Sequence, residues 1–103
     1  MPPVAAIIAF TETGGTAKRI CKFRPDVPII AVTNSRYTAK RLSYYWGVFS
    51  VIRDTVTDIT DYNKIALDVA KEFEIPQGAT IIITSGWGQK HGRTNSMSII
   101  DIP

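Results

Sequence analysis

Cysteine and histidine are nearly absent from this sequence, and long apolar runs are missing altogether. The single cysteine, Cys21, cannot form an internal disulfide, and neither a second cysteine nor a nearby histidine gives it the spacing of a metal ligand. The longest apolar runs, at residues 4–10 and 29–32, fall far short of the roughly 18 residues that suggest a membrane span. The pattern of a signal peptide is missing too. We therefore expect a cytoplasmic chain with no metal site and no membrane partner.

The sequence also shows no set of residues that is typical of a catalytic site. His91 is the only histidine, and no Ser/His/Asp set, carboxylate pair or metal-binding cluster is visible. The glycine-containing stretch TETGGTAK matches neither the P-loop spacing nor the dinucleotide-binding fingerprint. We expect no catalytic residue within this chain, and no enzymatic activity of the chain alone.

Acidic residues are rare in the first half of the chain, although the formal net charge is only +3. Between residues 13 and 53 one acid, Asp26, stands against eight basic residues: Lys18, Arg19, Lys22, Arg24, Arg36, Lys40, Arg41 and Arg53. Such a region can attract nucleic acid or phosphorylated ligands, but scattered Lys and Arg on helix faces are usually just solvated. No aromatic residues interleave with the basic ones as they do where single-stranded bases stack. A nucleic-acid-binding module is therefore only a lesser hypothesis for this basic region. We expect that the chain has no nucleic-acid partner.

What the chain does contain is an alternation of apolar strands and amphipathic helices. Runs rich in Ile and Val predict five strands, at residues 4–10, 29–32, 48–52, 80–84 and 97–102. Apolar residues spaced by three and four predict helices at residues 16–23, 35–46 and 58–73, with Gly47 as the C-terminal cap of the second. The connection to the last strand is too short for a crossover helix, so that strand should run antiparallel. This order predicts one domain over residues 1–103, an α/β fold of three layers (α/β/α) around a mixed five-stranded sheet.

Polar loops follow three of the predicted strands, at the edge of the sheet where open α/β folds bind ligands. The first loop is TETGGT, formed by Thr11, Glu12, Thr13, Gly14, Gly15 and Thr16. Its glycine N–H groups at a helix N-terminus, together with its threonine hydroxyls, would suit a phosphate. Glu12 carries the wrong charge for that anion. The second loop is TNSR, at residues 33–36.

The third loop, SGWGQKHGRTN at residues 85–95, carries basic residues on a glycine-rich backbone. Its candidate ligand-binding residues are Trp87, Gly88, Lys90, His91, Gly92, Arg93 and Thr94. Trp87 would act as a lid or a stacking surface. We expect His91 to be a solvated loop residue rather than a catalyst, and Trp46 to pack in the core or in an interface rather than to contact a ligand. Together the loops indicate phosphate binding without a base or a nucleophile.

Three stretches resemble a known family and span nearly the whole chain. They are AIIAFTETGGTA, RPDVPIIAVTNSRYTAKRLSYYWGV and SGWGQKHGRTNSMSI, in that order. This succession is similar to the C-terminal domain of pyruvate kinase. The resemblance implies a mixed five-stranded sheet, an allosteric effector site and one subunit interface of a tetramer. It also implies that the catalytic site, with its Mg²⁺ and K⁺, lies in barrel and lid domains that are absent here, so that this domain needs no cofactor.

The resemblance further implies roles for two of the loops. Family members that respond to fructose 1,6-bisphosphate hold one phosphate in the loop matching Thr11 to Thr16, and the loop matching Trp87 to Thr94 closes over the sugar. Glu12 departs from the Lys or Gln often found there, and a carboxylate close to a phosphate would repel it. The short segment between Ile52 and Asp61 has no counterpart of the Trp and Arg that some members aim at the second phosphate. A sugar phosphate or a nucleotide monophosphate fits these loops no worse than fructose 1,6-bisphosphate does.

Two main hypotheses follow for the function. The first is an allosteric effector-binding and oligomerisation domain of a pyruvate kinase, whose partners are other domains, identical subunits and a phosphorylated small molecule. The alternative is a stand-alone protein of the same fold that binds a small phosphorylated ligand. A barrel domain encoded immediately upstream would decide between them.

Overall fold

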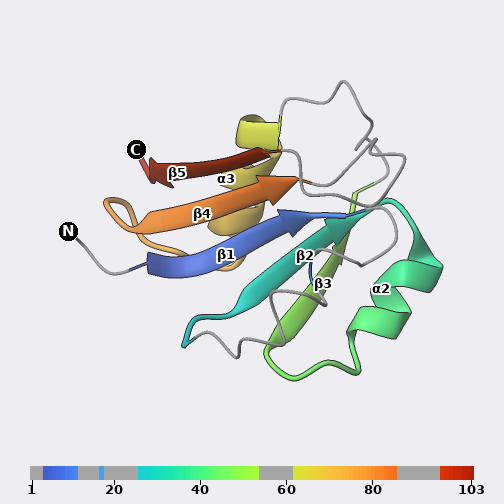
Figure 1. Cartoon of the computed structure of the whole chain (residues 1–103). Coiled ribbons are helices and arrows are strands. Elements are labelled where there is room, and N and C mark those ends of the chain that lie inside the picture. Colours follow the sequence, from blue (N-terminus) through green and yellow to red (C-terminus); the bar gives the residue numbers. More distant parts are fainter. Residues whose placement is uncertain (1–3, 12–16, 18–25, 54–61, 86–95) are drawn as a thin grey trace.

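The computed structural model describes residues 4–11, 17, 26–53, 62–85 and 96–103 (Figure 1). The strands in this part of the chain are β1 (Val4–Phe10), β2 (Ile29–Thr33), β3 (Val48–Ile52), β4 (Thr80–Ser85) and β5 (Ser96–Asp101). The helices are α2 (Arg36–Leu42) and α3 (Tyr62–Glu72). All five predicted strands are confirmed, and their ends lie within one residue of the expected positions.

The strands form one sheet in the order β3-β2-β1-β4-β5. β1 pairs in parallel with β2 and with β4, and β2 pairs in parallel with β3. Strand β5 runs antiparallel to β4 at one edge of the sheet, as Figure 1 shows. All five residues of β2 are buried, because strands in the centre of a parallel sheet are covered on both faces. The predicted mixed sheet with an antiparallel last strand is confirmed.

A helix packs against each face of the sheet, which gives the fold three layers. Ile8 and Phe10 of β1 lie in one core cluster with Val69 of α3. The intervening Ala9 lies in a second cluster with Leu42 of α2. Successive side chains of a strand point to opposite faces, so α2 and α3 cover opposite sides. In the view of Figure 1, α3 lies behind the sheet. The predicted α/β/α arrangement is confirmed.

Helix α2 is shorter than its apolar pattern predicts, and Gly47 is not its cap. The helix ends at Leu42, with Ser43 as the C-terminal cap. The amide of Tyr45 then donates to the carbonyl of Leu42 at 3.0 Å, a tighter turn than the α-helical one. Gly47 instead has a φ of 75° in the turn before β3, where its carbonyl accepts a hydrogen bond from the Ile29 amide at 2.9 Å. Glycine adopts this left-handed conformation without steric strain, so its role is in the turn.

The three aromatic residues after α2 divide between the core and the surface. Tyr45 packs against the cluster beneath α2. Tyr44 and Trp46 are exposed, and 73% of Trp46 is accessible. Of the two kinds of packing expected for Trp46, the core of this chain is therefore excluded, and packing in an interface stays a prediction.

The two other predicted helices lie only partly within the described residues. Of residues 16–23, only Ala17 is described, and it is helical and fully buried. Residues 58–61, the predicted first turn of the third helix with its acidic side chains, lie outside the described part. From Tyr62 onward the helix is confirmed as α3, ending one residue before the expected Phe73.

A left-handed residue ends α3. Glu74 has a φ of 59°, which is unusual for a residue with a side chain. Its amide donates to the carbonyl of Lys71, and the amide of Ile75 donates to the carbonyl of Ala70, both at 3.0 Å. These two bonds define a Schellman motif, in which glycine usually occupies the position of Glu74. Ile75 then packs against the core cluster that contains α3.

The left-handed conformation of Glu74 predicts that glycine at this position would stabilise the fold. Glu74→Gly should raise the free energy of unfolding by roughly 0.5–1 kcal/mol, because glycine relieves the strain of the left-handed conformation. Glu74→Ala removes the same charge but keeps the Cβ atom, so it should bring no such gain. Urea denaturation of both variants and the wild type measures the difference, and equal stability of the two variants would contradict the assignment.

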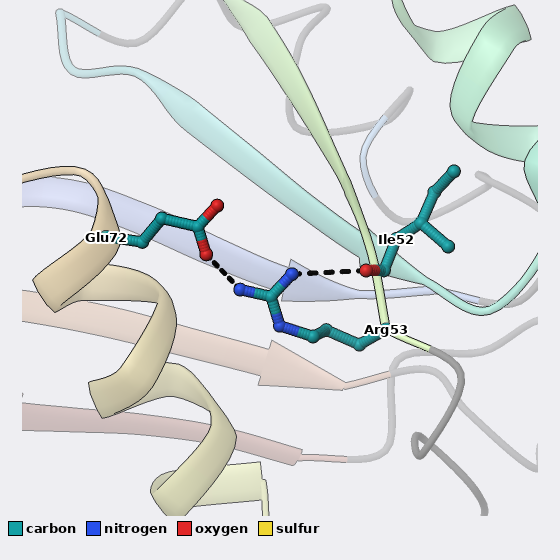
Figure 2. Close-up of polar contacts among 3 residues, drawn as sticks. All are labelled: Ile52, Arg53 and Glu72. Carbon is teal, nitrogen blue, oxygen red and sulfur yellow. Dashed lines mark hydrogen bonds and ion pairs between the residues drawn. The ribbon is translucent and has the colours of Figure 1, made fainter.

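One ion pair connects the end of β3 to α3. Figure 2 shows the Arg53 guanidinium reaching Glu72 of α3, and the same group donates to the carbonyl of Ile52 at 3.1 Å. The Arg53 amide also donates to the Thr33 carbonyl at 2.9 Å, which continues the pairing of β3 with β2. Arg53 is therefore directed toward α3.

We expect this ion pair to contribute little to stability, because 30% of the Arg53 side chain and 55% of the Glu72 side chain are exposed. In a double-mutant cycle with Arg53→Gln and Glu72→Gln, the coupling energy should stay below about 1 kcal/mol and shrink in high salt. Denaturation at two ionic strengths measures it. A larger coupling that persists in high salt would contradict this prediction.

Candidate functional site

The order of the strands places the topological switch point of the sheet between the carboxyl ends of β1 and β4, a position that we call the β1–β4 crevice. After β1 the chain continues to β2 on one side, and after β3 it returns to β4 on the other side of β1. Open α/β sheets bind ligands at such a switch point, outside the carboxyl ends of the strands. Phe10 and Ser85, the last paired residues of the two strands, lie side by side there. The fold therefore predicts a ligand at this switch point.

Both loops that carry the predicted site residues begin at this crevice. The first continues from Thr11, directly after β1, and the other continues from Ser85 at the end of β4. Most of the predicted residues lie outside the described part of the chain: Glu12, Thr13, Gly14, Gly15, Thr16, Trp87, Gly88, Lys90, His91, Gly92, Arg93 and Thr94. The described residues therefore bring the starting points of the two loops together, and the roles of the loop residues stay predictions.

Thr11 is the one predicted site residue that the structure describes. It is 3% exposed, and its amide donates to the Val32 carbonyl of β2 at 3.0 Å. This bond extends the β1–β2 pairing by one residue beyond the strand. The start of the first loop is therefore held by the sheet.

The second polar loop, TNSR, has a structural role at the start of α2. The Ser35 hydroxyl accepts a hydrogen bond from the Thr38 amide at 3.1 Å, and Ser35 is the N-cap of α2. The Thr33 hydroxyl in turn accepts one from the Ser35 amide at 3.2 Å. An N-cap serine is typically worth about 1 kcal/mol of helix stability. The Thr33 and Ser35 hydroxyls are thus engaged in forming the helix.

Buried hydroxyl groups concentrate at the carboxyl edge of the sheet. The buried polar residues of the described part are all Thr or Ser: Thr11, Thr33, Thr38, Thr80, Thr84 and Ser85. Only Thr80 lies at the opposite end, where its hydroxyl donates to a carboxylate oxygen of Asp101 at 2.8 Å. The buried polar side chains at the edge where a ligand is expected are therefore uncharged. The sequence prediction did not include Thr84 or Ser85 among the candidate ligand-binding residues, although Ser85 is the first residue of the third loop and both lie at the end of an apolar strand.

Two hydroxyls within the sheet lack a hydrogen-bond partner in the described part of the chain. They are Oγ1 of Thr84 on β4 and Oγ of Ser50 on β3. A buried polar atom left unpaired costs roughly 1–3 kcal/mol, so each such atom calls for an explanation. Thr84 lies at the crevice, next to the last residue of β4, whereas Ser50 lies in the middle of an edge strand.

The charged residues of the described ranges do not assemble into a metal site. No group of three or more His, Cys, Asp or Glu side chains comes together among them. Arg53, which follows β3 at the same edge of the sheet, is paired with Glu72. In this part of the chain the arrangement can therefore offer hydroxyl and amide donors to a ligand, but no assembled metal centre.

A separate cavity of about 480 Å³ lies at the other end of β4. Leu67 and Lys71 of α3 line it together with Ile75 and Ile102. The Gly78 amide, which precedes β4, donates to the Ile102 carbonyl at 2.8 Å beside it. This cavity is distinct from the β1–β4 crevice and was not predicted. As for membranes, neither described helix is long and apolar enough to span one.

Known proteins with similar sequences were identified along nearly the whole chain. The family model for the pyruvate kinase alpha/beta domain matches residues 2–100. Pyruvate kinases from Staphylococcus haemolyticus, Staphylococcus saprophyticus and Sporosarcina psychrophila are 44%, 42% and 36% identical over 101, 100 and 98 residues. Each comparison covers 93% of this chain and 17% of the relative, so the chain spans about a sixth of their length. On this evidence the chain belongs to the pyruvate kinase alpha/beta domain family.

Proposed function

We propose that residues 1–103 act as a single regulatory domain of a cytoplasmic pyruvate kinase, binding a phosphorylated effector in the β1–β4 crevice. The observation that supports the proposal is that the two predicted phosphate-binding loops start side by side, since Phe10 and Ser85, which precede them, are paired. The buried hydroxyls at the same edge supply polar, uncharged surroundings. Membership of the family supports the choice of pyruvate kinase as the enzyme.

The proposed domain regulates a reaction that takes place elsewhere. The enzyme would transfer phosphate from phosphoenolpyruvate to ADP, using Mg²⁺ and K⁺ in other domains of the parent chain. Effector binding at the crevice would change substrate affinity by favouring one packing of the subunits, and by no more than the effector's differential affinity for the two states. The effector would be a sugar phosphate, a sugar bisphosphate or a nucleotide monophosphate.

Glu12 provides the test of effector binding. A carboxylate beside a phosphate weakens its binding, so Glu12→Gln should tighten binding by on the order of 1 kcal/mol, or several-fold, and less in high salt. Thr13→Ala and Thr16→Ala should loosen it, since each removes a hydroxyl donor. Calorimetric titration with fructose 1,6-bisphosphate, glucose 6-phosphate and AMP at two ionic strengths measures these effects. If no variant binds any of the three ligands, the proposal fails and the first loop is only a tight turn between strand and helix.

We further propose that the domain contributes a contact between identical subunits. Strand β5 is an edge strand, and its Met97 and Ile99 side chains are exposed on one face. Edge strands with apolar side chains readily pair with another chain. The exposed aromatic side chains of Tyr44 and Trp46 after α2 also suit an interface, because aromatic residues are enriched there.

The subunit contact generates its own prediction. Light scattering should show a dimer that forms as the protein concentration rises, and Ile99→Lys should abolish it by placing a charge on the apolar face. Phe49→Lys is the matched control, since Phe49 is 52% exposed on the opposite edge strand and Ile99 is 55% exposed. Trp46→Ser tests the aromatic surface. A strict monomer at high concentration would count against the interface but would not affect the assignment of the fold.

A further inference from the structure

The two unpaired hydroxyls lie at opposite ends of one row of side chains across the sheet. Ala9 of β1 pairs with Thr84 of β4 on one side and with Ala31 of β2 on the other, and Ala31 pairs with Ser50 of β3. Residues paired directly across strands project from the same face. For this row it is the face covered by α2, since Ala9 and Ala31 belong to the cluster that contains Leu42.

Thr84 and Ser50 differ in their relation to the crevice. Thr84 is only 2% exposed and lies one residue before the end of β4, directly beside β1. Ser50 lies two residues before the end of β3, which is separated from β4 by both β2 and β1. Only Thr84 is therefore placed beneath the crevice between β1 and β4.

Threonine is an unexpected residue at the buried position of Thr84. Valine has nearly the same shape as threonine and would fill a buried position on β4 without an unpaired polar atom. The other threonine of β4, Thr80, uses its hydroxyl in a bond to Asp101. A buried hydroxyl with no such bond, at the position where the fold binds ligands, indicates a partner that comes from outside the chain.

We propose that Thr84 is a ligand-binding residue of the effector site, whose hydroxyl donates a hydrogen bond to the phosphate group of the ligand, directly or through one ordered water. This inference rests on the proposed function of the crevice. Hydrogen bonds to charged groups are stronger than those between neutral groups, so the bond would favour a phosphate monoester over an uncharged sugar of similar size. It would also add a contact from β4 to a site whose first loop follows β1.

Three substitutions test the inference by calorimetric titration with glucose 6-phosphate, fructose 1,6-bisphosphate and AMP. Thr84→Val should weaken binding of the ligand by about ten- to hundredfold, the loss expected for a single hydrogen bond to a charged group. Thr84→Ser keeps the hydroxyl and should bind within about twofold of the wild type. Ser50→Ala removes the other unpaired hydroxyl of the row and should leave binding unchanged.

Thermal unfolding of the same variants separates a binding role from a structural one. Thr84→Val should leave the melting temperature unchanged or raise it, because it removes an unpaired buried atom and preserves the packing. A fall in melting temperature together with affinity, in both the Val and the Ser variants, would assign Thr84 a structural role and overturn the inference.

The failure of this inference about Thr84 can be distinguished from the failure of the proposed function. If the wild type binds a phosphorylated ligand and Thr84→Val binds it equally well, the inference alone is wrong. If neither the wild type nor Glu12→Gln binds any of the three ligands, both are wrong.

Discussion

The parallel pairing of β1 with β4 is the contact on which the rest of the structure depends. It joins strands that are far apart in the chain, and its register places Phe10 beside Ser85 and Ala9 beside Thr84. A shift of one residue would move every side chain of a strand to the other face, so it would separate Ile8 and Phe10 from the core cluster beneath α3. The same packing that stabilises the domain therefore also fixes the crevice.

The crevice combines an uncharged floor with loops of mixed charge. Thr11, Thr84 and Ser85 are buried at this edge of the sheet, and the loop sequences that follow contain Glu12, Lys90 and Arg93. In the proposed function, hydroxyls and amides would orient a phosphate, and the loop charges would decide which phosphate is accepted. Arg53 lies at the same edge of the sheet but is paired with Glu72 of α3, so it contributes to joining β3 with that helix (Figure 2).

The sequence was sufficient to predict the layers of the fold, because its apolar runs have the length and composition of buried parallel strands. Helix ends were harder, since they depend on single backbone conformations. Gly47 suggested a cap but serves in a turn, and the left-handed conformation of Glu74 follows from no local preference. The loops of the proposed site were predicted from their polar residues, and their roles stay predictions. The row from Thr84 to Ser50 was not predicted, because it arises from the register between strands distant in the sequence.

The proposed function requires that a phosphorylated ligand binds at the carboxyl ends of β1 and β4. Chemical-shift mapping of the ¹⁵N-labelled chain during titration with glucose 6-phosphate locates the binding site. The largest shift changes should occur at the amides of Thr11, Thr84 and Ser85 and along the two loops that follow. Changes confined to the cavity between α3 and Ile102, or spread evenly over the basic residues of α2, would contradict the proposed function.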